Sequence, residues 1–366
     1  MSKPMNENAK VQHLMVMAGG TGGHVFPALA VAKELQKSGV RITWLGTRRG
    51  LEATVIPAND IDIEWVTVEG LRGKGALSLL LAPFKLLRAL WQSAVAINKV
   101  KPDCILGMGG FVAGPGGLMA RIMGKPLVIH EQNAVAGLTN QALAKVANTV
   151  LTGFPNVEGL PKKAQWLGNP VRNTIQANLS ETSPVIGDAH INVLIIGGSQ
   201  GAHSFNQKLP NVFAQLNNPR LSIWHQSGRD RASGVVEKYK EQKVDAKVDE
   251  FITDMAAAYE WADVLICRAG AMTIAECCAA AKPALLVPYP FSAGDHQIKN
   301  AQVMVDVGAG VMVMNEEIDS DKMQNALTTL LKSKQALIEM GKQAHSLHKP
   351  DALQQVADIC LEYINA

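Results

Sequence analysis

A histidine directly follows a cluster of glycines near the N-terminus. Residues 19–24 read Gly-Gly-Thr-Gly-Gly-His, and an apolar run follows them. Glycine clusters mark places where the backbone turns left-handed or approaches another group closely. An imidazole titrates near neutral pH, which suits it to general acid–base chemistry. The stretch therefore predicts a close approach to a ligand, with His24 as the first side chain that can act on it.

A second glycine cluster repeats the pattern in the other half of the chain. Residues 197–203 read GGSQGAH and follow the apolar segment 191–196, as the first cluster follows 11–17. Strand, glycine turn and helix in this order are typical of the first crossover of a Rossmann-like sheet. Such a turn presents backbone N–H groups and the positive end of a helix dipole, which favour phosphate. Neither cluster is a Walker loop, because no Gly-Lys-Ser/Thr follows.

Strand-like and helix-like segments alternate between and after the two turns. The strand-like segments are 41–46, 61–68, 103–108, 126–130, 221–226, 247–251, 263–268 and 283–288. The alternation predicts an α/β fold of parallel sheets with helices on both faces. The polar stretch 168–190 indicates a linker, so we expect two similar domains, 1–170 and 191–349, joined by 171–190. A last helix in 350–366 is expected to pack back toward the N-terminal domain.

Amino-acid composition indicates the compartment and the kind of partner of the protein. The first ten residues are polar, so no leader segment is expected. Five cysteines without metal-ligand spacing indicate a reducing compartment and no zinc site. Residues 1–170 carry 18 Lys and Arg against 10 Asp and Glu, whereas residues 171–366 carry 17 against 22. The basic half suggests an anionic partner: a phosphate, an acidic lipid surface or nucleic acid.

Six motifs in order identify a family. They are GGTGGH, HEQN, GNPVR, GGSQGA, RAGAMTIAE and DHQIKNA, spread over nearly the whole chain. Together they closely resemble the MurG family of bacterial N-acetylglucosaminyltransferases. The resemblance implies a GT-B fold, with two Rossmann-like domains and their parallel sheets facing across a cleft. It places the nucleotide sugar on the C-terminal domain and the acceptor on the N-terminal one.

The resemblance also implies the reaction. An inverting transferase of this family moves N-acetylglucosamine from UDP-N-acetylglucosamine to the 4-hydroxyl of the muramoyl sugar of lipid I, forming lipid II in peptidoglycan synthesis. It implies no cofactor, no bound metal and no nucleic-acid partner. It also implies a peripheral position on the cytoplasmic face of the bacterial cell membrane, at an anionic surface. Other cell-wall synthesis proteins are compatible partners, and the sequence names none of them.

Binding residues carry over motif by motif. Ser199 and Arg172 resemble diphosphate contacts, the backbone of Ile252 resembles a uracil contact, and Glu276 resembles the ribose ligand. The remaining resemblances are a loop around the nucleotide (Ala271, Met272, Thr273, Ile274, Ala275), two sugar-hydroxyl contacts (Asn133, Gln297) and a donor-facing turn (Thr21, Gly22, Gly23). A carboxylate such as Glu276 can accept two hydrogen bonds from a sugar diol, although it also complements a helix dipole.

Two residues compete for the role of general base. His24 is the first candidate, and Glu131, beside His130, is the second candidate or an orienting carboxylate. His203, in the second glycine turn, is expected to pack or cap. Two pairs fit the metal-binding Asp-x-Asp pattern, Asp60/Asp62 and Asp319/Asp321. The first enters a strand and the second resembles a helix cap, so both are interpreted as structural.

The most apolar stretch, residues 75–97, is too interrupted to span a bilayer, because Pro83, Lys85 and Arg88 lie within it. We expect a buried core helix from Pro83 onward. Leu77 to Leu81, flanked by Arg72, Lys74 and Lys85, are expected to form a membrane-docking patch.

Three alternatives stay open on the residues alone. One is a GT-B transferase with another acceptor. The second is an NADP reductase using Arg48 and Arg49, since the strand ending at Gly46 leads to no acidic ribose ligand. The third is a non-catalytic protein that binds sugar nucleotides or acts as a membrane scaffold.

Overall fold

The computed structural model describes residues 11–68, 81–171, 174–175, 190–198 and 201–366. The chain divides into two compact units. Unit 1 comprises Met1–Gln132, Ala136–Pro170 and Asp351–Ala366, and unit 2 comprises Asn133–Val135 and Val171–Pro350. The C-terminal helix thus belongs to unit 1, whereas most of the predicted linker lies outside the described residues.

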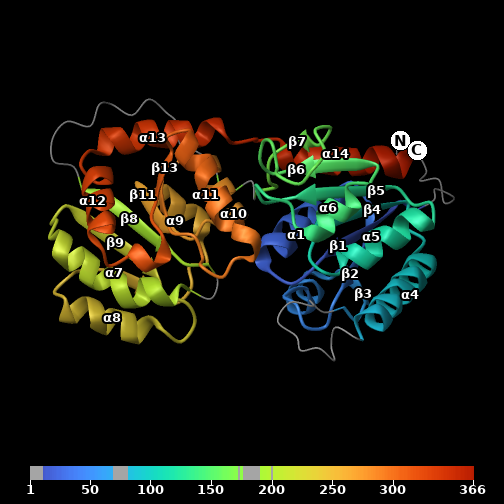
Figure 1. Ribbon diagram of the computed structural model, residues 1–366, viewed down its shortest axis with the longest axis horizontal. Helices are drawn as coiled ribbons and strands as arrows, with labels where there is room; N and C mark the ends of the chain where they lie inside the picture. The colour runs from blue at the N-terminus through green and yellow to red at the C-terminus, as the bar shows by residue number, and fades with distance from the viewer. Residues whose placement is uncertain (1–10, 69–80, 172–173, 176–189, 199–200) are drawn as a thin grey trace, which may run out of the picture. The chain divides into compact units, whose positions relative to one another are not determined.

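Unit 1 is built on a parallel sheet of seven strands in the order β3-β2-β1-β4-β5-β6-β7 (Figure 1). Its strands are β1 (His13–Ala18), β2 (Arg41–Gly46), β3 (Asp62–Trp65), β4 (Cys104–Gly109), β5 (Leu127–Glu131), β6 (Thr149–Thr152) and β7 (Gln165–Trp166). Its helices are α1 (Gly22–Lys37), α2 (Glu52–Val55), η1 (Pro57–Asn59), α4 (Ala82–Val100), α5 (Ala113–Ile122), α6 (Leu138–Leu143) and α14 (Ala352–Asn365).

Unit 2 repeats the arrangement with six parallel strands in the order β10-β9-β8-β11-β12-β13. Its strands are β8 (Ile191–Ile196), β9 (Leu221–Gln226), β10 (Lys247–Asp249), β11 (Val264–Cys267), β12 (Ala284–Leu286) and β13 (Gly310–Met312). Its helices are α7 (His203–Leu216), α8 (Ala232–Glu241), α9 (Met255–Trp261), α10 (Ala271–Ala279), η2 (Ala293–Asp295), α11 (His296–Asp306), η3 (Asn315–Glu317), α12 (Asp321–Leu330) and α13 (Lys334–Ser346).

The two sheets confirm the predicted α/β class and fix where a ligand can bind. In each sheet the first strand of the unit is central and the chain then reverses direction along the sheet, so β1 lies beside β4 and β8 beside β11. In sheets of this kind ligands bind at the carboxyl ends of the strands, at this reversal. The glycine turns after β1 and β8 lie at that point in their units. Strands β6, β7 and β13 were not predicted.

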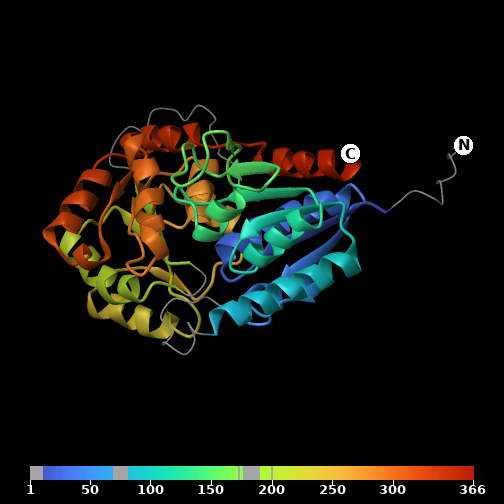
Figure 2. The ribbon, with the colours of Figure 1, turned by 45° about the vertical axis from the view of Figure 1, so that its right-hand side comes forward.

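Strand β1 shows how the core of unit 1 forms. Side chains alternate between the two faces of a strand, and both faces of β1 are buried. Leu14 and Val16 pack in one cluster with α1 and α14, whereas Met15 and Met17 pack in a second cluster with α4 and α5. Figure 2 shows α14, in red, and α4, in cyan, on opposite sides of this sheet. Helix α14 therefore completes one layer of unit 1.

Helix α4 corrects one prediction. It was expected to be a buried core helix, yet Phe84, Leu87 and Trp91 have exposed fractions of 69%, 63% and 67%. The helix buries small residues instead, among them Ala89, Ser93 and Ala96. Phe84, Leu87 and Trp91 thus face away from the core, because the small residues and Ile97 provide the contact with it. Among the described residues, no helix has the length and apolar character needed to cross a membrane.

Candidate active site

The glycine turn after β1 is organised around a buried carboxylate. Glu52 is fully buried, and its Oε2 accepts a hydrogen bond from the Gly20 N–H at 2.9 Å. Its Oε1 accepts hydrogen bonds from the backbone N–H and the hydroxyl of Thr47, at 3.0 and 2.7 Å. Charge-assisted hydrogen bonds of this kind stabilise a buried carboxylate. In the glycine turn after β1, the Gly20 N–H thus already donates to a carboxylate of the protein itself.

His24 lies in the first turn of α1, next to this glycine turn. Thr21 is the N-cap residue and its carbonyl oxygen accepts from the His24 N–H at 3.1 Å, while Gly22 and Gly23 are helical. The His24 side chain is half-buried, and its Nδ1 lies 2.9 Å from Oε1 of Gln132. The structure therefore joins the histidine of the first motif to the glutamine of HEQN.

A glycine at the end of β4 makes room for the imidazole. A Cβ on Gly109 would lie 2.8 Å from Nδ1 of His24, and Gly109 has a φ of +101°. The following Gly110, with a φ of +83°, passes so close to the first turn that a Cβ would lie 2.4 Å from the carbonyl oxygen of Gly19. Both positions therefore require glycine for space and for backbone conformation.

Glu131 occupies a different environment. Its side chain is 2% exposed, and Oε2 accepts hydrogen bonds from the Gly137 N–H at 3.1 Å and from Nδ2 of Asn140 at 2.8 Å. These bonds tie the end of β5 to the start of α6. The geometry favours a role for Glu131 in holding this loop rather than in taking a proton from a substrate.

In unit 2, the turn after β8 leads into the N-terminus of α7. Ser199 and Arg172 lie outside the described residues. Of the rest of the turn, Gly201 has a φ of +67°, and a Cβ there would lie 2.0 Å from the Ser227 carbonyl oxygen. His203 is the first residue of α7 and is exposed, with Ala202 at the N-cap position. The expectation that His203 packs or caps was therefore wrong.

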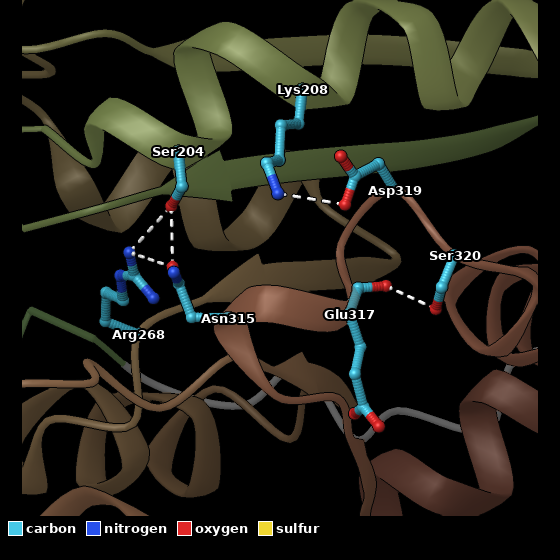
Figure 3. Close-up of polar contacts among 7 residues, drawn as sticks. All are labelled: Ser204, Lys208, Arg268, Asn315, Glu317, Asp319 and Ser320. Atoms are coloured by element: carbon cyan, nitrogen blue, oxygen red, sulfur yellow. Dashed lines mark hydrogen bonds and ion pairs between the residues drawn. The ribbon is translucent and has the colours of Figure 1, made fainter.

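A half-buried arginine lies beside this turn, at the carboxyl end of β11. Figure 3 shows Arg268 converging with Ser204 and Asn315: its Nη2 donates to Oγ of the serine and to Oδ1 of the asparagine, each at 2.9 Å. Its Nη1 donates to the carbonyl oxygens of Val287 and Pro288, both at 3.2 Å. Burial lowers the pKa of Arg268 to about 10. The group stays charged at neutral pH, and its four acceptors are uncharged.

Glu276 lies in α10, where a tyrosine orients it. Ala271–Glu276, which resemble the family's loop around the nucleotide, are the first six residues of this helix, which follows Gly270 as N-cap. The hydroxyl of Tyr259 donates to Oε2 of Glu276 at 3.0 Å. Burial, followed by the charge of Glu276, raises the pKa of Tyr259 and keeps its proton in place. The hydroxyl of Tyr259 thus holds the orientation of the Glu276 carboxylate, and Glu276 itself is half-buried.

Two of the remaining predicted contacts involve α11, and Ile252 follows β10 at one edge of the sheet. Oε1 of Gln297 accepts from the Tyr289 N–H at 2.8 Å, so the amide N–H groups are the ones that can donate to a ligand. Oδ1 of Asn133 accepts from Nδ2 of the buried Asn300 at 3.2 Å. Ile252 is buried, which leaves its backbone as the part that can contact a ligand.

The two Asp-x-Asp pairs have structural partners. Asp319 pairs with Lys208 at 2.9 Å, as Figure 3 shows, and Asp321 is the first residue of α12. Asp60 is the C-cap residue of η1, and Oδ2 of Asp62 lies 3.6 Å from Nη2 of Arg41. Within the described part of the chain, no group of three or more His, Cys, Asp or Glu side chains could hold a metal ion.

Family models match both units. The model described as the glycosyltransferase family 28 N-terminal domain matches residues 14–152, and the C-terminal domain of the same family matches residues 192–356. The chain belongs to glycosyltransferase family 28. The resemblance suggested by the six motifs is thereby confirmed at the level of the enzyme family.

Relatives of known name are similar over nearly the full length. A Shewanella loihica protein named UDP-N-acetylglucosamine--N-acetylmuramyl-(pentapeptide) pyrophosphoryl-undecaprenol N-acetylglucosamine transferase is 45% identical, and the match covers 96% of this chain and 97% of the relative. A relative of the same name from Shewanella halifaxensis is 43% identical over 98% of both.

Solved structures agree with the fold. The crystal structure of Acinetobacter baumannii MurG is 38% identical, has a TM-score of 0.83, and matches 96% of this chain and 99% of that one. The glycosyltransferase of kitacinnamycin, at 16% identity and a TM-score of 0.71, covers 97% of this chain and 100% of its own and shows the shared fold alone. The family 28 chain therefore has the GT-B fold.

Sequence reasoning did not single out Glu52, Gly109, Gln132, Tyr259 or Arg268. Gln132 and Arg268 lie inside motifs that were quoted for other residues, and Gly109 directly follows the strand-like segment 103–108. The one signal that could have pointed to Glu52 is an acidic residue shortly after a strand in a Rossmann-like unit, where such a residue commonly meets a ribose.

Replacing Gly109 tests the space that it provides for His24. We expect Gly109→Ala to lower kcat about tenfold, because the added Cβ displaces the imidazole. Gly39→Ala is the matched control: Gly39 also has a positive φ, +81°, but nothing lies within 4 Å of its Cβ position. Both variants should lose about 1 kcal/mol of unfolding free energy from backbone strain. Equal kcat values for the two variants would contradict this account.

Proposed function

We propose that this chain transfers N-acetylglucosamine from UDP-N-acetylglucosamine to the 4-hydroxyl of the muramoyl sugar of lipid I and so makes lipid II. The observation that carries the proposal is the 43–45% identity, over nearly the whole chain, to enzymes named for that transfer. The side chains held at the carboxyl ends of the two sheets supply the chemistry that such a transfer needs.

His24 acts as the general base. Its imidazole takes the proton of the acceptor 4-hydroxyl as that oxygen forms a bond to C1 of N-acetylglucosamine. The bond between C1 and the diphosphate oxygen breaks at the same time, and UDP leaves with the electron pair. Because attack comes from the face opposite the leaving group, the α-linked donor gives a β-1,4 product. His24 is favoured over Glu131 because the buried Oε2 of Glu131 is already engaged by Gly137 and Asn140.

Unit 2 binds the donor and stabilises the leaving diphosphate. The N-terminus of α7 presents the positive end of a helix dipole, and the half-buried cation of Arg268 adds to the field there. Ser199 and Arg172 are proposed as direct diphosphate contacts. Glu276, oriented by Tyr259, accepts hydrogen bonds from the ribose, and Ile252 meets the uracil through its backbone. The nucleotide is lined by Ala271–Ala275. Sugar hydroxyls are contacted by Gln297 and Asn133. The donor is approached by the turn of Thr21, Gly22 and Gly23.

The enzyme acts peripherally, at the cytoplasmic face of the cell membrane. Helix α4 exposes Phe84, Leu87 and Trp91, which recur every three to four residues and so share one side of the helix. Lys85 and Arg88 are exposed on the same helix. Helix α5, which packs against α4, exposes Leu118 and Ile122. Exposed apolar side chains next to basic ones suit insertion into an anionic lipid surface. Of the leucine segment predicted to dock, only Leu81 lies in the described part, and it is exposed.

Transfer by the purified chain tests the proposed function. We expect release of UDP and formation of lipid II when the enzyme receives UDP-N-acetylglucosamine and lipid I together. His24→Ala should lower kcat about 100-fold or more, while the Kd for UDP stays within about threefold. His203→Ala, which removes the histidine that ends the second glycine turn, is the matched control and should leave kcat within about twofold.

Other outcomes distinguish the alternatives. UDP release with a different acceptor alone would indicate another GT-B transferase. Thermal stabilisation by UDP without turnover on any acceptor would indicate a binding protein, and stabilisation by NADP but not by UDP would indicate a reductase. Equal losses of UDP affinity and kcat in His24→Ala would move His24 from base to binding residue.

A triple substitution tests the membrane surface. We expect Phe84→Ser/Leu87→Ser/Trp91→Ser to weaken binding to vesicles that contain anionic lipid by tenfold or more, because burial of each side chain contributes about 2 kcal/mol. Transfer to a water-soluble acceptor analogue should be unchanged. The control Val11→Ser/Leu138→Ser/Phe251→Ser removes equally exposed apolar side chains elsewhere. If the control loses as much vesicle binding as the α4 variant, α4 is not the docking surface.

A further inference from the structure

One chain of hydrogen bonds joins three of the sequence motifs and ends at His24. It starts at the carbonyl oxygen of Gly168, in GNPVR, and passes through His130 and Gln132, both in HEQN. From Gln132 it reaches His24, in GGTGGH. All four residues belong to unit 1. Each hydrogen bond has a donor and an acceptor. Because the Gly168 carbonyl oxygen can only accept, it determines which atom donates in each of the bonds that follow.

The first link fixes the tautomer of His130. Its Nε2 lies 2.9 Å from the Gly168 carbonyl oxygen, and because a carbonyl can only accept, Nε2 carries the hydrogen. His130 is fully buried, and burial lowers its pKa to about 4, although the bond to Gly168 and the charge of Glu131 oppose this. The ring is therefore neutral at physiological pH. Its Nδ1 has no hydrogen and can only accept.

The second link fixes the amide of Gln132. Its Nε2 lies 3.1 Å from the carbonyl oxygen of His130 and 3.2 Å from Nδ1 of the same residue. Both of these atoms are acceptors, so the amide nitrogen must face them. The backbone of Gln132 is held as well, because its carbonyl oxygen accepts from Nδ2 of Asn169 at 3.0 Å. The reversed amide would place an oxygen against two acceptors, which makes that orientation unfavourable.

The third link transmits this orientation to His24. The oxygen Oε1 of Gln132 faces Nδ1 of His24 at 2.9 Å, and an amide oxygen only accepts. His24 must therefore carry its hydrogen on Nδ1, and the neutral ring has its lone pair on Nε2. We propose that Gln132, oriented by His130, is a positioning residue that fixes His24 in the tautomer whose Nε2 can take a proton.

This constraint matters because a free histidine side chain prefers the opposite tautomer in water. With the hydrogen on Nε2 the ring would offer the acceptor hydroxyl a donor where the reaction needs a base. The proposal rests on the proposed function for the role of His24, but the tautomer itself is a property of the protein without substrate. No proton moves along the chain: Nδ1 of His24 keeps its hydrogen and its bond to Gln132 while Nε2 gains one.

The two described groups that contact the ring are uncharged, and Glu52, the buried carboxylate of the adjacent glycine turn, is bonded to Gly20 and Thr47. From the neighbouring elements, Gln132 after β5 and the backbone of Gly109 in β4 contact the ring, and neither titrates. His130 stands behind Gln132, and the Oε2 atom of Glu131 is bonded to Gly137 and Asn140. On α1 itself the next titratable side chains are Lys33 and Glu34, more than two turns away. The hydrogen bond to a neutral amide is thus the local control on which nitrogen is protonated.

Nitrogen NMR of the histidine side chains tests the proposal directly. The full chain is labelled with ¹⁵N-histidine and observed near pH 8.5, well above the usual histidine pKa of about 6.5. The signals of His24 are identified by their loss in His24→Ala. We expect the wild-type protein to show a protonated Nδ1 and an unprotonated Nε2 for His24, with the opposite pattern for His130. A His24 that carries its hydrogen on Nε2 would overturn the proposal without any variant.

A substitution then tests the cause. Gln132→Met keeps the unbranched shape of the side chain but removes the acceptor, so His24 should shift toward the Nε2-protonated tautomer. Its kcat should fall about tenfold or more, with KM for UDP-N-acetylglucosamine within about twofold of wild type. Gln141→Met is the matched control, since Gln141 also donates to a backbone carbonyl, that of Ala136, at 2.8 Å. It should change neither the tautomer nor kcat.

The outcomes separate this inference from the proposed function. An unchanged His24 tautomer in Gln132→Met would refute the positioning role even if transfer were fully active. Failure of the wild-type protein to act on lipid I would refute the proposed function and leave the tautomer result standing. Equal losses of kcat in Gln132→Met and Gln141→Met, with His24 unaltered in both, would reduce the role of Gln132 to general stability.

Discussion

The contact between two glycine turns in unit 1 determines where the reactive imidazole can lie. Strands β1 and β4 pair at the centre of the sheet, so the turns that follow them are neighbours. Gly110 approaches the backbone of Gly19, and Gly109 passes under the ring of His24, at distances that no Cβ would allow. The His24 ring therefore packs against the backbone of Gly109 on one side, and its Nδ1 is directed toward Gln132. The position of the His24 ring in unit 1 follows from this absence of side chains.

The two glycine turns look alike in sequence but differ in electrostatics. The turn after β1 donates one N–H to the buried carboxylate of Glu52, and room for that carboxylate comes from Gly19, Gly46 and Gly50. The turn after β8 lies beside Arg268, a half-buried cation that donates to uncharged acceptors. A carboxylate beneath one turn disfavours a bound diphosphate, and a guanidinium beside the other favours one. This electrostatic difference supports the proposal that the nucleotide binds to unit 2.

Local pattern was sufficient to predict much of the fold. Strands β2, β8 and β9 have the bounds that their apolar runs indicate, because parallel strands buried on both faces read as continuous apolar segments. Strand β7 was missed because it has two residues and no pattern. The environment of α4 was predicted wrongly because an apolar helix face is the same sequence signal whether it meets a core or faces outward.

Candidate site residues could be proposed from the sequence only where they belong to a motif. His24 and Glu276 were proposed from their motifs, but their hydrogen-bond partners depend on contacts between distant parts of the chain. Gln132 meets a residue 108 positions away, and Arg268 is held by groups from three different segments. Glu52 reads in sequence as an ordinary acidic residue at the start of a short helix, and only its burial against the turn of Gly20 shows what it does. Such interactions arise from the sheet order rather than from any local pattern.

Photolabelling distinguishes binding of the nucleotide by unit 2 from binding by the glycine turn after β1. The chain would be irradiated with an azido analogue of UDP-N-acetylglucosamine, with and without excess UDP, and the modified peptides mapped by mass spectrometry. The account predicts labelling that UDP prevents, confined to peptides of unit 2 around β10, α10 and α11. Labelling that UDP prevents on the peptide containing the first glycine turn, at a yield equal to that on unit 2, would contradict it.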